Sequence, residues 1–171
     1  MTIPKSVKLL ALVPLVFLTQ CDAFKPKVNY GYDIELKVSP KGEAALKTSQ
    51  GLFVDAWFYG EAAPQYRSEA DQLNRIDLGA DHLDFPAGAR RLHVTGEDAD
   101  PSKLSHTHDG VMRVFVSVDR TGAPADGPQL KCHDFIGTLA QAQKEPVVMR
   151  CEFENETYWE DAADSASSSS Q

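Results

Sequence analysis

Two histidines in a short polar segment are the residues of this chain best suited to hold a metal ion. His106 and His108 alternate within Ser105-His106-Thr107-His108-Asp109. On a strand, both imidazoles would therefore point the same way, with Asp109 nearby. Zinc needs three or four ligands, and the others would have to come from distant histidines. The alternative is a polar turn before Val111. We expect no metal and no cofactor, with His106 and His108 as the candidates should a metal bind.

The chain carries no recognisable catalytic motif. A serine or cysteine hydrolase needs a nucleophile, a base and an orienting acid, and no G-x-S-x-G motif is present. Asp55 is the one acid set among aromatic residues, and burial there would raise its pKa. The simpler expectation is that Asp55 faces a polar edge or pairs with an arginine such as Arg113. We expect a protein that is not an enzyme.

Aromatic residues gather around Asp55 and could form a binding face. Trp57, Phe58 and Tyr59 are consecutive, and Tyr66 follows shortly after. Such residues can line a face that binds a sugar or a peptide. Aromatic residues in strands belong more often to the core, so we expect Trp57 to be buried.

The elements that would position these residues are mostly strands. Apolar residues alternate with polar ones in 33–38 and in 111–119, as in half-buried strands. Residues 51–60 are apolar on both faces except at Asp55, which predicts a central strand covered on both sides. Shorter strands are expected at 75–78, 91–95, 129–136 and 146–154. Short helical stretches are expected after Ser39-Pro40, within 61–74 and at 137–144.

About seven short strands separated by turn residues predict a mainly β protein, an antiparallel β-sandwich with one or two short helices. The pattern resembles the transthyretin-like or immunoglobulin-like sandwiches of bacterial envelope lipoproteins. The expected domain covers residues 30–154. Residues 21–29, with Pro26, predict a tether.

The C-terminal segment differs in composition from the rest of the chain. Residues 155–171 are acidic and rich in serine, so they have little to bury and predict a disordered tail. Tyr158 and Trp159 begin this segment and are candidate anchors for a partner. The alternative, which we favour, is that Trp159 folds back onto the domain.

The first 21 residues have the layout of a secretory leader. Lys5 and Lys8 precede an apolar run, Leu9–Leu18, and a cysteine follows at position 21. The run is too short for a permanent membrane span, which needs ~20 apolar residues. An uncleaved anchor is therefore disfavoured.

Leu18-Thr19-Gln20-Cys21 resembles the lipobox of bacterial lipoproteins. The resemblance implies that residues 1–20 are a signal peptide and that Cys21 is acylated. The protein would then be tethered to a membrane through its N-terminal lipid, facing the periplasm. Asp22 slightly favours the inner membrane. Gln20 departs from the small residue usual at that place, which leaves open an ordinary leader with Cys21 as a free thiol.

The chain has three cysteines. If Cys21 carries lipid, Cys132 and Cys151 remain as a pair, and an even number in an oxidising compartment predicts one disulfide. The alternative is a redox-active pair, which usually has a C-x-x-C spacing that is absent here.

The charge of the chain restricts its partners. The net charge is −8. Removing the leader takes away two lysines and no acids, so 15 basic and 25 acidic residues leave −10. This charge argues against nucleic acid and favours a basic protein partner. We expect a non-enzymatic interaction module of the envelope, either a secretion-machine accessory or an inhibitor or immunity protein. The alternative is a protein that binds a sugar or a metal.

Overall fold

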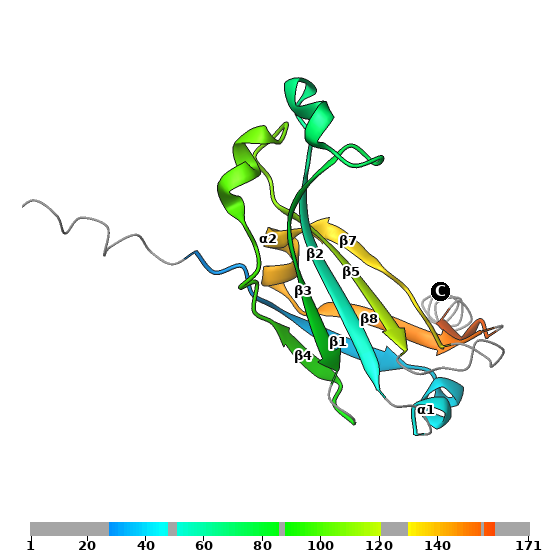
Figure 1. The fold of residues 1–171 in the computed structure, drawn as a ribbon. Helices are drawn as coiled ribbons and strands as arrows, with labels where there is room; N and C mark the ends of the chain where they lie inside the picture. Colours follow the sequence, from blue (N-terminus) through cyan, green and yellow to red (C-terminus); the bar gives the residue numbers. More distant parts are fainter. Residues whose placement is uncertain (1–27, 48–50, 86–87, 121–129, 155, 160–171) are drawn as a thin grey trace, which may run out of the picture.

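The chain folds into two four-stranded sheets, so the predicted mainly β sandwich with short helices is confirmed (Figure 1). The computed structural model describes residues 28–47, 51–85, 88–120, 130–154 and 156–159. The expected leader, Cys21 and most of the tether lie outside the described residues. So do residues 160–171 of the expected tail.

The elements follow one another along the chain as short strands with few helical segments. The strands are β1 Tyr32–Val38, β2 Leu52–Glu61, β3 Arg75–Phe85, β4 Arg91–Val94, β5 Arg113–Arg120, β6 Leu130–Cys132, β7 Phe135–Thr138 and β8 Val147–Phe153. The α-helices are α1 Pro40–Leu46 and α2 Leu139–Lys144, and the 3-10 helices are η2 Pro64–Glu69 and η3 Pro101–His106.

The two sheets have the strand orders β4-β1-β8-β6 and β3-β2-β5-β7. Among the described strands every pairing is antiparallel except β1 with β8, where Ile34 lies opposite Val147 in a parallel register. This pair is a departure from the expected antiparallel sandwich. Alternation along one strand does not set the direction of its neighbour, which depends on the path of the chain between them.

The core lies between the two sheets. The predicted inward faces of 33–38 and 111–119 are confirmed, because alternate residues of β1 and β5 are buried. Fully buried side chains from both sheets include Ile34, Val54, Phe58, Leu78, Val94, Val114, Val116 and Met149. Burying such side chains supplies the main driving force for folding, about 1.5–3 kcal/mol for each large one.

β2 is central in its sheet, as predicted, but only one of its faces is covered. Val54, Ala56 and Phe58 are fully buried, whereas Trp57 is 47% exposed. The expectation that Trp57 is buried is therefore wrong. Aromatic residues are favoured on any pleated surface, so their presence in a strand does not tell whether a second layer covers them.

Two strand boundaries also differ from the expectation. Residues 129–136 are not one strand, because β6 and β7 belong to different sheets and the chain crosses between them at His133-Asp134. β3 was expected to end at Gly79, but it continues through this glycine to Phe85. Gly79 has a φ of 106°, and the register with β2 shifts between Trp57 and Tyr59, as at a β-bulge.

A buried carboxylate on β3, that of Asp81, binds the loop that follows β4 and holds it beside this bulge. Asp81 is 4% exposed and accepts the N–H groups of Gly96 (2.8 Å) and Asp98 (3.3 Å) and the hydroxyl of Thr95 (3.2 Å). These bonds offset the cost of burying the carboxylate. A Cβ at Gly79 would collide with the Asp98 carbonyl. The position therefore requires glycine for its space as well as for its φ.

Candidate binding face

The outer face of the β3-β2-β5-β7 sheet carries a row of exposed apolar side chains. Trp57 on β2 lies opposite Phe115 on β5, and Phe115 lies opposite Ile136 on β7. Trp57 is 47% exposed, Ile136 is 68% exposed and Phe115 is half-buried between them. The four strands lie side by side, so the row crosses the sheet (Figure 1). Contiguous exposed apolar surface of this kind marks binding sites on soluble domains.

A groove opens beside Trp57 at one end of this row. Its volume is about 550 Å³, and its lining includes Trp57, Tyr59, Asp77, Gly79 and Ala80. Ala80 is the residue of β3 in register with Trp57. Gly79 and Ala80 are the two smallest residue types, so they leave space beside Trp57, which is 47% exposed.

The arginines of this face are already paired within the chain. The Arg75 guanidinium lies over the Tyr59 ring, 5.3 Å from its centroid, and donates to Asp71 at 2.9 Å. Arg113 donates to Asp109 at 2.8 Å and pairs with Glu61 at 3.2 Å.

These contacts hold the Asp109 side chain in its charged form. The hydrogen bonds from the Arg113 side chain and from the Val111 N–H lower the pKa of Asp109 to about 2. Asp77, Asp84 and Asp119 are exposed on the same outer face and form no ion pair with any described residue. Asp77 lines the groove beside Trp57, whereas Asp84 and Asp119 both lie opposite Phe53, four residues along β2 from Trp57. The face therefore combines an apolar row with unpaired acids at the groove and further along the strands.

Asp55 lies on the outer face, where its carboxylate is hydrogen-bonded to Nδ1 of His82 on β3 rather than paired with Arg113. The His82 ring stacks on Phe53, with the ring centroids 6.0 Å apart. Ser117 is the residue opposite Asp55 on its other side. The carboxylate thus lies between the imidazole and the hydroxyl. This order differs from that of a nucleophile–base–acid triad, in which the base stands in the middle.

His106 ends η3 and His108 lies in the bend after it, so the two are not alternate residues of one strand as the metal hypothesis required. The His106 ring stacks on Tyr66, with the centroids 4.0 Å apart, and its Nδ1 lies 2.9 Å from a Glu69 oxygen. The backbone N–H of His108 donates to the Glu61 carbonyl. Within the described part of the chain, no group of three or more His, Cys, Asp or Glu side chains is placed to hold a metal ion.

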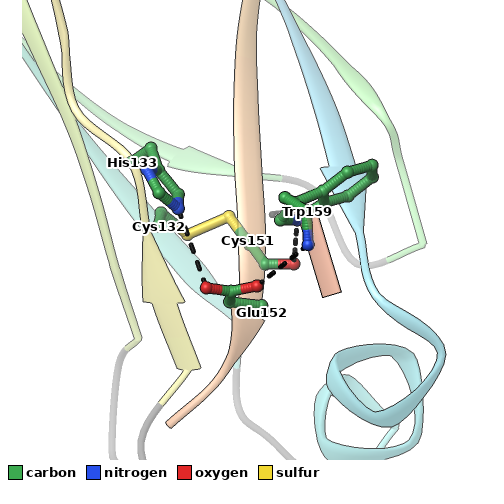
Figure 2. Close-up of a disulfide and its surroundings, with 5 residues drawn as sticks. All are labelled: Cys132, His133, Cys151, Glu152 and Trp159. Atoms are coloured by element: carbon green, nitrogen blue, oxygen red, sulfur yellow. Dashed lines mark hydrogen bonds and ion pairs between the residues drawn. A yellow bond between two sulfur atoms is a disulfide. The ribbon is translucent and has the colours of Figure 1, made fainter. Parts of the chain in front are cut away.

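A disulfide joins Cys132 of β6 to Cys151 of β8, as the cysteine count predicts (Figure 2). The two residues are directly opposite in the antiparallel register, and their Cα atoms are 3.9 Å apart. Cys151 is fully buried. Next to it on β8, the buried Glu152 carboxylate lies 3.7 Å from His133 Nε2. The disulfide ties the edge strand β6 to the strand that pairs with β1.

Trp159 folds back onto β8, as expected, so its indole is a structural contact (Figure 2). The indole N–H donates to the Cys151 carbonyl at 3.3 Å, and the backbone N–H donates to Glu152 at 3.4 Å. Tyr158 packs edge-on against Trp159 and is 39% exposed. Of the two expected partner anchors, Tyr158 is the more exposed.

Glu156 adds a second contact to this segment. Its carboxylate accepts the buried Ser39 hydroxyl at 2.6 Å and the Phe153 N–H at 3.1 Å. Ser39 also accepts the Gly42 N–H and so caps α1, as predicted. The hydrogen bond from Ser39 lowers the pKa of Glu156. The folded domain therefore extends beyond the expected boundary at residue 154, because residues 156–159 are bound to α1 and β8.

This contact predicts that two C-terminal deletions have different effects. A protein ending at Trp159 should unfold at the same temperature as the full chain. One ending at Glu154 should unfold at a lower urea concentration, because the Ser39 hydroxyl and the Phe153 N–H lose their acceptor and the contacts of Trp159 with β8 are removed. Urea titrations at neutral pH measure both. The difference should shrink as acid protonates Glu156, since its lowered pKa stabilises the fold only while it is charged. Equal stability of the two deletions would contradict this role.

No protein-family model matches this chain, and neither the curated proteins nor the solved structures contain a significant match. In the described residues there is no helix long and apolar enough to cross a membrane.

Sequence reasoning singled out Trp57 but missed Phe115 and Ile136 as its neighbours in the row. A signal for Phe115 was present. It stands between Arg113 and Ser117 on the polar side of an alternating strand, where a large apolar residue is out of place. Ile136 carried no such signal, because the segment around it was predicted as a single strand.

Proposed function

We propose that this protein is a non-enzymatic interaction module of a bacterial envelope, held by a lipid on Cys21, and that the outer face of the β3-β2-β5-β7 sheet binds a basic protein. The exposed row of Trp57, Phe115 and Ile136 is the observation that carries the proposal. A few side chains near the centre of an interface supply most of its binding energy, and tryptophan is one of the residue types enriched among them.

The charge around the row favours a partner of opposite sign. On this face Asp77, Asp84 and Asp119 form no ion pair with any described residue, whereas Arg75 and Arg113 are both paired. Unpaired acidic groups on a binding face speed its association with a basic surface and disfavour an acidic one. A secretion-machine accessory and an inhibitor or immunity protein would use such a face in the same way. A neighbouring toxin gene would favour the inhibitor.

Replacing Ile136 with aspartate is expected to abolish partner binding without unfolding the domain. Ile136 is 68% exposed on an edge strand, so the change alters stability little, but it places a charge at the β7 end of the apolar row, next to Phe115. The lipidated protein is purified from membranes with its partner, and the partner's charge and its release by salt are measured. Val28→Asp is the matched control, because Val28 is 60% exposed and lies outside the sheets.

The expected result is a basic partner that is released at high salt, retained by Val28→Asp and lost from Ile136→Asp. Recovery of the same partner with Ile136→Asp would place the interface elsewhere. An acidic partner, or none, would contradict the proposal.

The anchor has its own test. Cys21→Ser is expected to move the protein from the membrane fraction to the soluble periplasm, or to leave an unprocessed precursor, because the acylated thiol is lost. Mass spectrometry of the mature N-terminus measures the modification directly. Two or more acyl chains on one residue anchor stably, where a single chain does not. An unmodified mature N-terminus in the wild-type protein would exclude the lipid.

A sugar ligand is the second candidate, favoured by the groove beside Trp57. An exposed indole bordered by polar groups suits stacking against a sugar ring, and the groove volume of about 550 Å³ lies in the range of small-ligand sites. The two candidates differ in charge, since a neutral sugar would bind equally well at low and high salt.

A further inference from the structure

We propose that the groove beside Trp57 receives an arginine side chain of the basic partner, with the guanidinium over the indole and paired with Asp77. This inference rests on the proposed function and names the chemistry by which that face recognises its partner. Arginine suits such a site better than lysine, because its planar group stacks on an aromatic ring while pairing with a carboxylate.

The groove already contains one arrangement of this kind. Arg75 lies over the Tyr59 ring at 5.3 Å and pairs with Asp71 at 2.9 Å, so a ring, a guanidinium and a carboxylate meet within the chain. Trp57 is the preceding outward-facing residue of β2 and lines the same groove. No cation of the described residues lies over its ring. Tryptophan is the best aromatic partner for a cation.

Asp77 supplies the carboxylate. It lies on β3 opposite Tyr59, lines the groove and is exposed. Its side chain accepts the N–H of Gly79 at 3.0 Å, which orients the carboxylate, and it forms no ion pair with any described residue. The Asp77 carboxylate is therefore free of ion pairs with the described residues and can pair with the arginine of a partner.

Two small residues of β3, Gly79 and Ala80, leave room for the partner's arginine side chain beside Trp57. Gly79 cannot be enlarged, because its φ is 106° and the Asp98 carbonyl lies behind it. Ala80, in register with Trp57, is then the residue that decides how much of the indole stays open. Ala80→Leu would fill this space without changing any charge.

The test follows the Trp57 indole N–H by NMR while peptides are added to the full-length protein. The probes are a capped Gly-Arg-Gly peptide, the same peptide with neutral citrulline in place of arginine, and a neutral trisaccharide of N-acetylglucosamine. The arginine peptide is expected to shift the Trp57 signal, and neither the citrulline peptide nor the sugar should do so. Asp77→Asn and Ala80→Leu should each weaken this binding roughly tenfold or more. The control Asp119→Asn should leave it unchanged, since Asp119 lies outside the groove.

The other outcomes overturn the inference. Equal shifts with the arginine and citrulline peptides would show that binding does not depend on the positive charge of the side chain. A shift with the sugar alone would show that the groove binds a carbohydrate. If no probe shifts the signal up to its solubility limit, the groove binds neither an arginine side chain nor this sugar. The natural partner separates this inference from the proposed function. A partner lost from Ile136→Asp but retained at full affinity by Asp77→Asn and Ala80→Leu would leave the proposed function standing and remove the groove from it.

Discussion

Replacing Val116 with aspartate is expected to prevent the domain from folding. Val116 is fully buried on β5, between Ala56 of β2 and Phe135 of β7. No described arginine, lysine or histidine is among the buried residues that could pair with a carboxylate there. Burying an unpaired charge costs several kcal/mol even after relaxation, and a domain of this size is stable by only about 5–15 kcal/mol.

The adjacent residue supplies a matched control for that experiment. Ser117 points to the opposite side of β5, facing Asp55 on the outer face of the sheet. Ser117→Lys therefore also introduces a charge into the strand, but toward water and beside an acid. We expect Ser117→Lys to express as a folded protein with cooperative urea unfolding, and Val116→Asp to be insoluble or unfolded by circular dichroism. A cooperatively unfolding Val116→Asp protein would overturn the assignment of this face of β5 to the core.

Removing the disulfide is expected to lower the free energy of unfolding by about 2–5 kcal/mol. Cys132 and Cys151 are 19 residues apart in sequence, and closing a loop of this length restricts the unfolded chain by about 3 kcal/mol on the chain-entropy model. The double variant Cys132→Ala with Cys151→Ala tests this, since alanine at the buried position 151 adds no polar group. The bond also holds β6, a strand of three residues, at the sheet edge.

Reductant provides the internal control for this prediction. Adding it to the wild-type protein should lower the urea midpoint to that of the double alanine variant, and it should leave the variant unchanged. In protein isolated from cells without reductant, Cys132 and Cys151 should resist alkylation until the protein is reduced. Rapid alkylation of both thiols without reductant would show that the pair is not joined in the cell.

The sequence alone was sufficient for the features that depend on near neighbours. The period of two in 33–38 and 111–119 predicted which residues of β1 and β5 face the core. Ser39-Pro40 predicted the start of α1. With Cys21 set aside as the expected lipidation site, the count of cysteines predicted the bond between β6 and β8. Each of these inferences uses spacing within one segment or the number of a residue type, and both are complete in the sequence.

The candidate site depended instead on contacts between distant segments. That Trp57 lies on an uncovered face, beside Phe115 and Ile136, follows from the strand order β3-β2-β5-β7 and its register. That β1 and β8 run parallel follows from the path of the chain between them. Alternation fixes which side chains share a face, because it is a property of one strand's pleat. The layer that covers a face, and the neighbour across from each residue, are decided only when the sheets assemble.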